Sequence, residues 1–83
     1  MSTIKEITEK YEKAYIVFKD IDSRRRFVSE ALKEGVVFTN GSLPKLSNTD
    51  DVIMLYSNKT IARLGWAGRV NYYNNQDITK IKY

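Results

Sequence analysis

The chain contains no cysteine and no histidine, and only one proline, Pro44, among its 83 residues. Without cysteine, it cannot form disulfide bridges or thiolate metal sites, and a reducing compartment is favoured. Without histidine, it lacks the commonest general base and the commonest ligand of transition metals. The adjacent Asp50 and Asp51 would point to opposite faces of a strand, and with Asn48 they lack the spacing of an oxygen-ligand metal site. We therefore predict a protein that is not an enzyme and that has no catalytic residue, no metal site and no cofactor.

Long apolar runs are also missing from the sequence. No run approaches the roughly 18 residues that a membrane-spanning helix requires. The first residues do not contain the apolar segment of a signal peptide. We therefore expect a cytoplasmic protein without a membrane partner. The length predicts a single domain over residues 1–83, with a modest hydrophobic core.

Acidic residues become scarce toward the end of the chain. The net charge is +4, but residues 1–34 contain eight Lys and Arg against seven Asp and Glu. Residues 52–83 contain five Lys and Arg against one acidic residue, Asp77. The excess positive charge therefore belongs to the last part of the chain, where it favours an anionic partner.

The first residues carry the signals of an amphipathic helix. Thr3 and Glu6 have the spacing of a capping box, and apolar residues recur at helical spacing from Ile4 through Ala14. This apolar stripe packs either on the rest of the domain or on a second copy of the protein. In the second case residues 1–14 are an oligomerisation element, and the protein is a homo-oligomer.

A second helix is predicted after an apolar strand at residues 15–18. Asp20 is suited to cap this helix, and Gly35 is suited to end it. The inner stripe of the helix is predicted to consist of Phe27, Val28, Ala31 and Leu32. The outer side is predicted to carry Arg25, Arg26, Ser29, Glu30 and Lys33.

Residues 50–66 are predicted to form a β-hairpin that organises the rest of the fold. Residues 52–55 are apolar at every position, which indicates a central strand buried on both faces, and residues 57–59 supply the turn. We interpret residues 65–68 as a glycine-flanked bend, followed by strands at residues 70–73 and 78–83. A short strand at residues 36–39 and a long loop at residues 42–51 precede the hairpin.

Together these elements predict an α+β fold. We expect a small, twisted, mostly antiparallel β-sheet of about five or six strands, with two α-helices packed on one face. The other face of the sheet is then covered by the long loop or by a partner.

Arginine and aromatic side chains are mixed in the last third of the chain. Guanidinium groups and flat rings together are typical of surfaces that hold nucleotides or single-stranded nucleic acid. The same residues are also explained as core aromatics and solvated arginines. The candidate binding residues are Arg63, Trp66, Arg69, Tyr72 and Tyr73, with Arg25 and Arg26 as an extension of the basic surface.

The order of the elements resembles that of small uncharacterised proteins encoded by phages and prophages of Gram-positive bacteria. The resemblance covers about residues 14–83 and rests on the strand at residues 15–18, Asp20 and the charged helix, the strands that follow Gly35 and Asp51, the pair Gly65 and Gly68, and the strand at residues 78–81. It implies a host-takeover or anti-defence factor that acts in the host cytoplasm.

We therefore predict a non-enzymatic, phage-type accessory protein that acts by binding. The leading hypothesis is an anti-defence inhibitor that engages a host defence protein or an anionic, nucleotide-like signal. Direct binding of nucleic acid is the first alternative. A small structural or oligomeric interaction module is the second.

Overall fold

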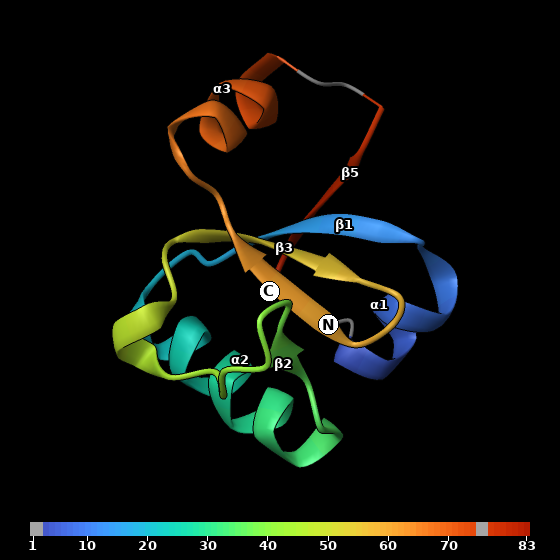
Figure 1. Ribbon diagram of the computed structural model, residues 1–83, viewed down its shortest axis with the longest axis vertical. Helices are drawn as coiled ribbons and strands as arrows, with labels where there is room; N and C mark the ends of the chain where they lie inside the picture. Colours follow the sequence, from blue (N-terminus) through green and yellow to red (C-terminus); the bar gives the residue numbers. More distant parts are fainter. Residues whose placement is uncertain (1–2, 75–76) are drawn as a thin grey trace.

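The computed structural model describes residues 3–74 and 77–83. Within these residues, three helices and a short 3-10 helix accompany a five-stranded sheet (Figure 1). The elements in chain order are α1 (Ile4–Lys10), β1 (Lys13–Val17), α2 (Ile21–Glu34), β2 (Val37–Phe38), η1 (Leu46–Asn48), β3 (Val52–Tyr56), β4 (Thr60–Arg63), α3 (Trp66–Asn74) and β5 (Thr79–Lys82). The predicted α+β class is confirmed.

The sheet has the strand order β2-β4-β3-β1-β5 and is mixed. The central strand β3 pairs antiparallel with β1 and with β4, whereas β5 lies parallel to β1 and β2 lies parallel to β4. The prediction of a mostly antiparallel sheet therefore holds only for the three central strands. Parallel pairing requires a long connection, and both outer pairs have one: η1 and β3 lie between β2 and β4, and most of the chain lies between β1 and β5.

The hairpin around which we expected the fold to be organised is present as β3 and β4. Residues 52–55 are all buried, as their uniformly apolar character predicts. The turn closes with Lys59 in the left-handed region at a φ of 64°. The loop at residues 42–51 is held by η1, and its Pro44 is fully buried.

Helix α1 is shorter than its apolar spacing predicts. Thr3 caps it as expected, accepting a hydrogen bond from the Glu6 backbone N–H at 3.2 Å. The helix ends at Lys10, and Ala14 belongs to β1, where it lies opposite Leu55. The prediction of a helix through residue 14 was wrong because the sheet recruits this part of the chain as a strand. The apolar side chains of α1 are buried in the same core as α2, and a role for α1 in oligomerisation stays a prediction.

Helix α2 begins and ends where the sequence predicts. The Asp20 carboxylate accepts a hydrogen bond from the Ser23 backbone N–H at 2.8 Å, and Gly35 ends the helix with a φ of 75°. Hydrogen bonds from the backbone N–H and then the side chain of Ser23 stabilise the ionised carboxylate and lower the pKa of Asp20 below its usual value. Phe27 and Ala31 are buried as predicted.

Two side chains of α2 do not lie where the helical stripe predicts. Leu32 is half exposed, so it does not belong to the inner stripe. Glu30 is half-buried, and its Oε1 accepts hydrogen bonds from the Ile4 backbone N–H and the Tyr83 hydroxyl, both at 2.9 Å. Glu30 therefore ties the start of α1 and the end of the chain to α2, a contact that local spacing does not reveal.

The last third of the chain contains a helix where a bend and a strand were predicted. Residues 66–74 form α3, and the Arg69 backbone N–H donates to the Gly65 carbonyl at 3.0 Å as in an α-helix. The strand prediction at residues 70–73 was wrong because the β propensity of valine and tyrosine is weak against tertiary context. Gly68 allows the close approach of Leu64 to the helix, since a Cβ atom at this position would lie 3.3 Å from the Leu64 Cβ.

The helices lie on both sides of the sheet. Helices α1 and α2 share one face, as predicted, and α3 lies over the other face, where we expected the loop or a partner (Figure 1). On the first face α1 and α2 complete a cluster of buried side chains that includes Ile16, Phe27 and Ile53. On the second face the buried cluster is small and consists of Tyr15, Val52 and Met54.

Candidate functional site

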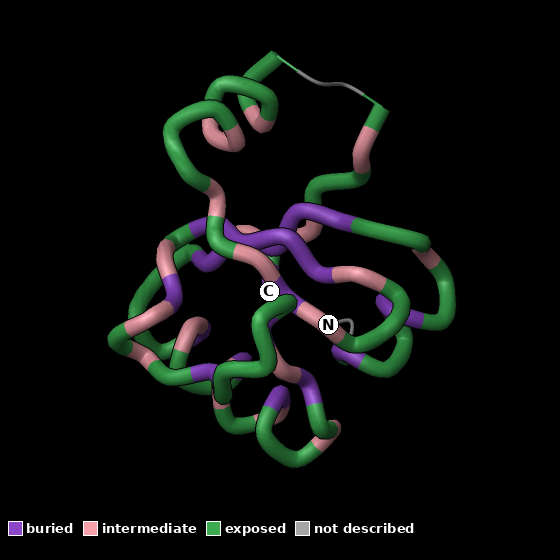
Figure 2. The backbone as a smooth tube through the Cα atoms, viewed as in Figure 1, coloured by how far each residue is buried: buried purple, intermediate pink, exposed green. Residues whose placement is uncertain are grey.

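Helix α3 is packed only loosely against the sheet. None of its residues is buried, whereas β1 and β3 beneath it are buried along most of their lengths (Figure 2). In the ribbon view α3 stands away from the body of the protein (Figure 1). It is therefore a helix whose side chains are largely available for contacts with another molecule.

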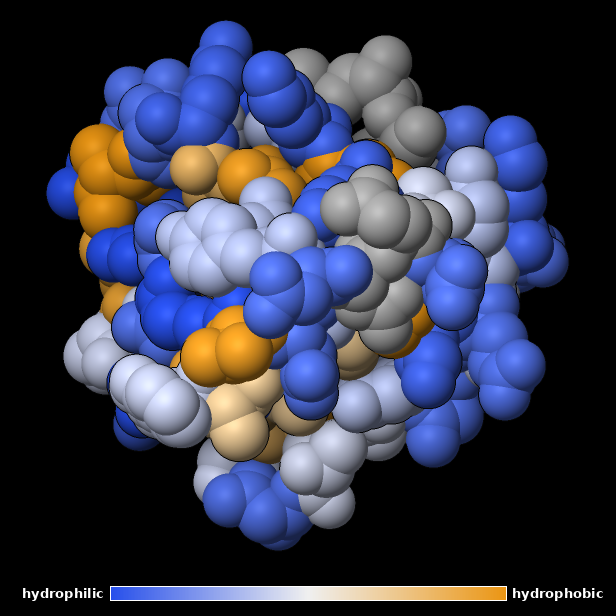
Figure 3. All heavy atoms as spheres, turned by 90° about the horizontal axis from the view of Figure 1, so that it is seen from above, coloured by the Kyte–Doolittle hydropathy of each residue, from blue (hydrophilic) through white to orange (hydrophobic). Residues whose placement is uncertain are grey.

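The outer side of α3 carries three exposed apolar side chains. Trp66 is 85% exposed, Val70 is 40% exposed and Tyr73 is 68% exposed. Their spacing of four and then three residues places them on one face of the helix. We call these three residues the outer stripe of α3. On this side of the molecule, hydrophobic side chains form separate patches among hydrophilic ones (Figure 3).

The two arginines predicted to bind an anion are already engaged in ion pairs. Arg63 Nε lies 3.2 Å from Asp50 Oδ2, and Arg69 Nη2 lies 2.7 Å from Asp51 Oδ1. The hydrogen bond from Arg69 lowers the pKa of the Asp51 carboxyl below its usual value and raises the pKa of Arg69. Each pair joins one exposed and one partly buried side chain, and the two carboxylates offset the two guanidinium charges, so the surface beside α3 is not simply basic.

Tyr72 packs toward the sheet, and its ring also meets the ring of Tyr73 edge to face, with the centroids 5.2 Å apart. The Tyr72 ring meets the buried ring of Tyr15 edge to face, with the centroids 5.0 Å apart, and the ammonium group of Lys80 lies 4.6 Å from its centroid. Tyr72 therefore helps to attach α3 to the sheet. Of the five predicted binding residues in this region, Trp66 and Tyr73 present their rings most openly.

Arg25 and Arg26 lie on α2, which packs on the opposite face of the sheet from α3. Arg25 Nη1 is 3.8 Å from Asp22 Oδ1, and Arg26 donates a long hydrogen bond of 3.4 Å to Ser23 Oγ. The fold therefore does not bring these two residues together with Trp66, Arg69 and Tyr73. They do not extend the surface around α3.

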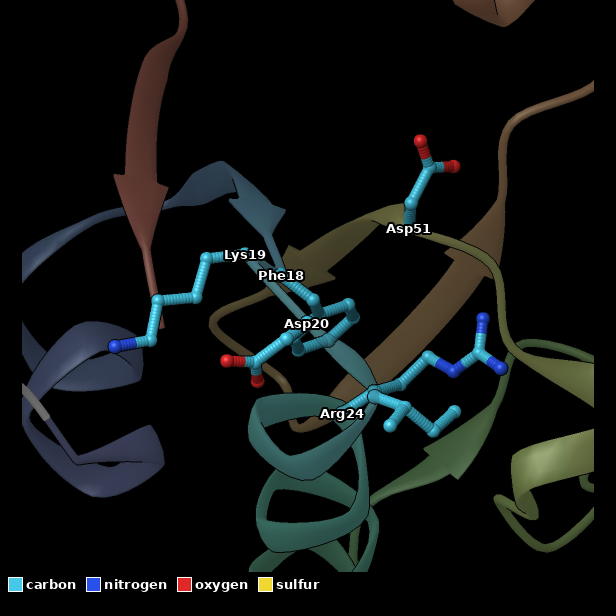
Figure 4. Close-up of a pocket in the computed structure, with 6 residues that line it drawn as sticks. Phe18, Lys19, Asp20, Arg24 and Asp51 are labelled. Carbon is cyan, nitrogen blue, oxygen red and sulfur yellow. The ribbon is translucent and has the colours of Figure 1, made fainter.

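A hollow of about 270 Å³ lies at the start of α2, between Phe18, Arg24 and Asp51. Its charged groups point in different directions: the Asp20 and Lys19 side chains extend to one side, and the Arg24 guanidinium extends to the other (Figure 4). Asp20 caps α2 and Asp51 pairs with Arg69, so both carboxylates already have partners. The arrangement provides no pair of convergent groups for acid–base chemistry.

Three residues that matter at this surface are absent from the set predicted from sequence. Val70 completes the outer stripe, and Asp50 and Asp51 neutralise the two arginines. The spacing of Trp66, Val70 and Tyr73 places them on one face only if they belong to a helix. The sequence was interpreted as a bend and a strand, so this face was not recognised. The ion pairs join residues 13 and 18 positions apart, which only the fold brings together.

Among the described residues, no group of three or more acidic side chains is arranged to hold a metal ion. No helix in the described part of the chain is long and apolar enough to cross a membrane. Comparison of the chain with protein-family models, with curated proteins and with solved structures finds no match. The candidate site therefore rests on the geometry of α3 and its surroundings.

Proposed function

We propose that this protein acts by binding a partner protein through the outer stripe of α3, without catalysis. The observation that carries this proposal is the exposure of Trp66, Val70 and Tyr73 on one face of a single helix. Helices that bind in an apolar groove present anchors at this spacing. Tryptophan and tyrosine are also the residues that contribute most often to the binding energy of protein interfaces.

The charges beside the stripe favour a protein partner over a polyanion. A phosphate backbone that approached Arg63 or Arg69 would also meet the carboxylates of Asp50 and Asp51. An apolar centre surrounded by paired charges is instead the ordinary composition of a protein–protein interface. The complementary surface is therefore an apolar groove with a polar rim, and affinity for it should depend only weakly on salt.

The charge of the protein disfavours a second copy of this chain as the partner of the outer stripe. The protein has a net charge of +4, and Arg69 is the only charged residue of α3. Because Arg69 is paired with Asp51, the repulsion between two copies comes from the net charge of +4 that each copy carries, and it disfavours self-association most at low salt. We therefore propose a partner other than a second copy of this chain. The resemblance to phage proteins implies an anti-defence factor, so we also propose that the partner is a host defence protein and that binding inhibits it.

The proposal is tested by capture from a host lysate with matched variants. Trp66→Ala and Val70→Asp should each abolish recovery of the partner, because the first removes the largest anchor and the second places a charge in the apolar contact. Leu43→Ala is the control, since Leu43 is 58% exposed but lies outside α3. All three positions are solvent-exposed, so the melting temperature should change little, by the equivalent of about 0.5 kcal/mol or less.

Fluorescence of the purified complex gives a direct second measurement. Trp66 is the only tryptophan, and it should emit as a solvent-exposed indole in the free protein. Its emission should shift to shorter wavelength when the captured partner is added. Equal capture by Trp66→Ala and the parent protein, or an unchanged emission in the complex, would contradict the proposal.

Direct binding of nucleic acid is the alternative that the exposed rings of Trp66 and Tyr73 and the net charge of +4 support. In that case bases would stack on the two rings, and affinity would fall steeply between low and moderate salt. Replacing Asp50 and Asp51 with asparagine should then strengthen binding, because the phosphates would meet less negative charge. A protein partner held by the outer stripe predicts little change from the same substitutions.

A further inference from the structure

A hollow of about 400 Å³ lies between the inner side of α3 and the sheet. Its floor includes Tyr15, Met54 and Ala62, which the strand register places side by side on β1, β3 and β4. Gly68 and Asn71 of α3 form part of the wall. The volume lies within the range of about 300–1,000 Å³ that small-molecule sites occupy.

The hollow leaves apolar side chains incompletely covered. Tyr56, Ala62, Leu64 and Ile78 all line it, and each is only partly buried. A ligand in the hollow would remove these side chains from water and would also fill the space between α3 and the sheet. The hydrophobic effect therefore favours a flat, apolar group against this floor.

The polar groups of the lining point to a ligand with negative charge. Lys13 and Arg63 both line the hollow, and none of its lining residues is acidic. The Arg63 guanidinium already pairs with Asp50, so Lys13 is the main candidate to meet an anion and Arg63 can share its remaining donors. The Asn71 amide, which also lines the hollow, can both donate and accept hydrogen bonds.

We propose that this hollow is a second binding site, for a planar aromatic ring that carries an anionic group, as in a nucleoside monophosphate. The ring lies over the floor formed by Met54 and Ala62, and the anionic group is held at Lys13. This site is separate from the outer stripe, because α3 turns Gly68 and Asn71 toward the hollow and presents Trp66, Val70 and Tyr73 to solvent. The two proposals can therefore fail independently.

The test is a titration of the full chain with AMP, GMP, CMP and UMP, followed by amide chemical shifts. At least one nucleotide should bind with a dissociation constant below about 1 mM. The largest shifts should occur at residues 54, 62, 68 and 71. Inorganic phosphate should bind much more weakly, since it cannot cover the apolar floor.

Variants then distinguish a specific binding site from the general attraction of anions to a basic protein. Ala62→Leu fills the hollow and should weaken binding at least about tenfold, whereas Ala67→Leu adds the same side chain to an exposed position outside it and should not. Lys13→Gln should also weaken binding about tenfold, as expected for the loss of a charge-assisted hydrogen bond. Lys5→Gln on α1 is its control.

Two outcomes would overturn the proposal. One is the absence of saturable binding of any of the four nucleotides at about 1 mM. The other is equal affinity of the parent protein and Ala62→Leu, provided that this variant melts at or above the temperature of the parent. If Ala62→Leu melts below the parent or does not fold, equal affinity of Lys13→Gln and Lys5→Gln decides against the site. Loss of protein capture in Trp66→Ala has no bearing on these measurements.

Discussion

The two faces of the sheet are covered in very different ways. On one face, α1 and α2 bury Ile4, Phe27 and Ala31 completely, and the rings of Phe18, Phe27 and Tyr83 pack edge to face. On the other face, α3 buries none of its own residues and leaves a hollow beneath it. The comparison indicates that the first face provides most of the stability, whereas the second leaves side chains available for binding.

The difference can be traced to the sequences of the helices. Helix α2 is a 14-residue helix with a carboxylate cap and a glycine end, and it turns Phe27 and Ala31 inward. Helix α3 has nine residues and turns Gly68 and Asn71 toward the sheet together with one large side chain, Tyr72. Since a glycine and an asparagine bury little apolar area, α3 gains little from packing, and its largest apolar side chain faces solvent.

The largest expected effect comes from removing the centre of the well-packed face. Phe27→Ala should lower the free energy of unfolding by about 3–5 kcal/mol, because it leaves a cavity beside two other rings. In a small domain this is a large part of the total stability. Denaturant unfolding monitored by circular dichroism would measure it. A loss below about 1 kcal/mol would contradict the assignment of stability to this face.

A pH titration should identify a second contribution to stability on the same face, that of Tyr83. Burial and the hydrogen bond to Glu30 raise the pKa of Tyr83 to about 12, above the value near 10 of an unfolded tyrosine. The unfolded chain therefore loses this proton first as pH rises. The resulting stability is present below pH 10 and should be lost between about pH 10 and 12, amounting to no more than about 3 kcal/mol for a shift of this size.

The control for this titration is Tyr83→Phe, which keeps the ring and removes the hydroxyl. This variant should be less stable than the parent at neutral pH, because Glu30 loses one of its two hydrogen-bond donors. It should also lose the part of the alkaline transition that belongs to Tyr83. A transition of unchanged size in Tyr83→Phe would show that other groups cause it.

Truncating a side chain on the face covered by α3 should have a smaller and more local effect on stability. Tyr72→Ala removes the ring that α3 packs against Tyr15, and it should lower the free energy of unfolding by roughly 1 kcal/mol. Circular dichroism should show a loss of helix, and the sheet should stay folded. If Tyr72→Ala destabilises the protein as much as Phe27→Ala, the two faces do not differ in the way proposed.

The well-packed face was largely predictable because its signals are local. The caps at Thr3 and Asp20, the glycine end at Gly35 and the buried run at residues 52–55 all follow from neighbouring residues. The role of Glu30 was not predictable, since its partners are 26 and 53 positions away. Local spacing placed it on the outer side, and only the fold brings Ile4 and Tyr83 to it.

The face of the sheet covered by α3 was predicted less well, because its structure depends on contacts between residues that are distant in the sequence. Valine and tyrosine favour strands on average, but residues 70–73 have no strand partner in the described structure and lie in α3. The concentration of basic residues after residue 52 was real, yet Asp50 and Asp51 pair with two of them across the surface. Trp66 and Tyr73 were nevertheless among the residues singled out from the sequence.

Native-state hydrogen exchange tests the central comparison most directly. Amides of β1, β3 and α2 should exchange with a free energy close to that of global unfolding, because these elements form the well-packed core. Amides of α3 should exchange at a free energy lower by at least about 2 kcal/mol, since the helix can detach while the sheet stays folded. Protection of α3 equal to that of β3 would show that both faces are packed alike, and would contradict the account.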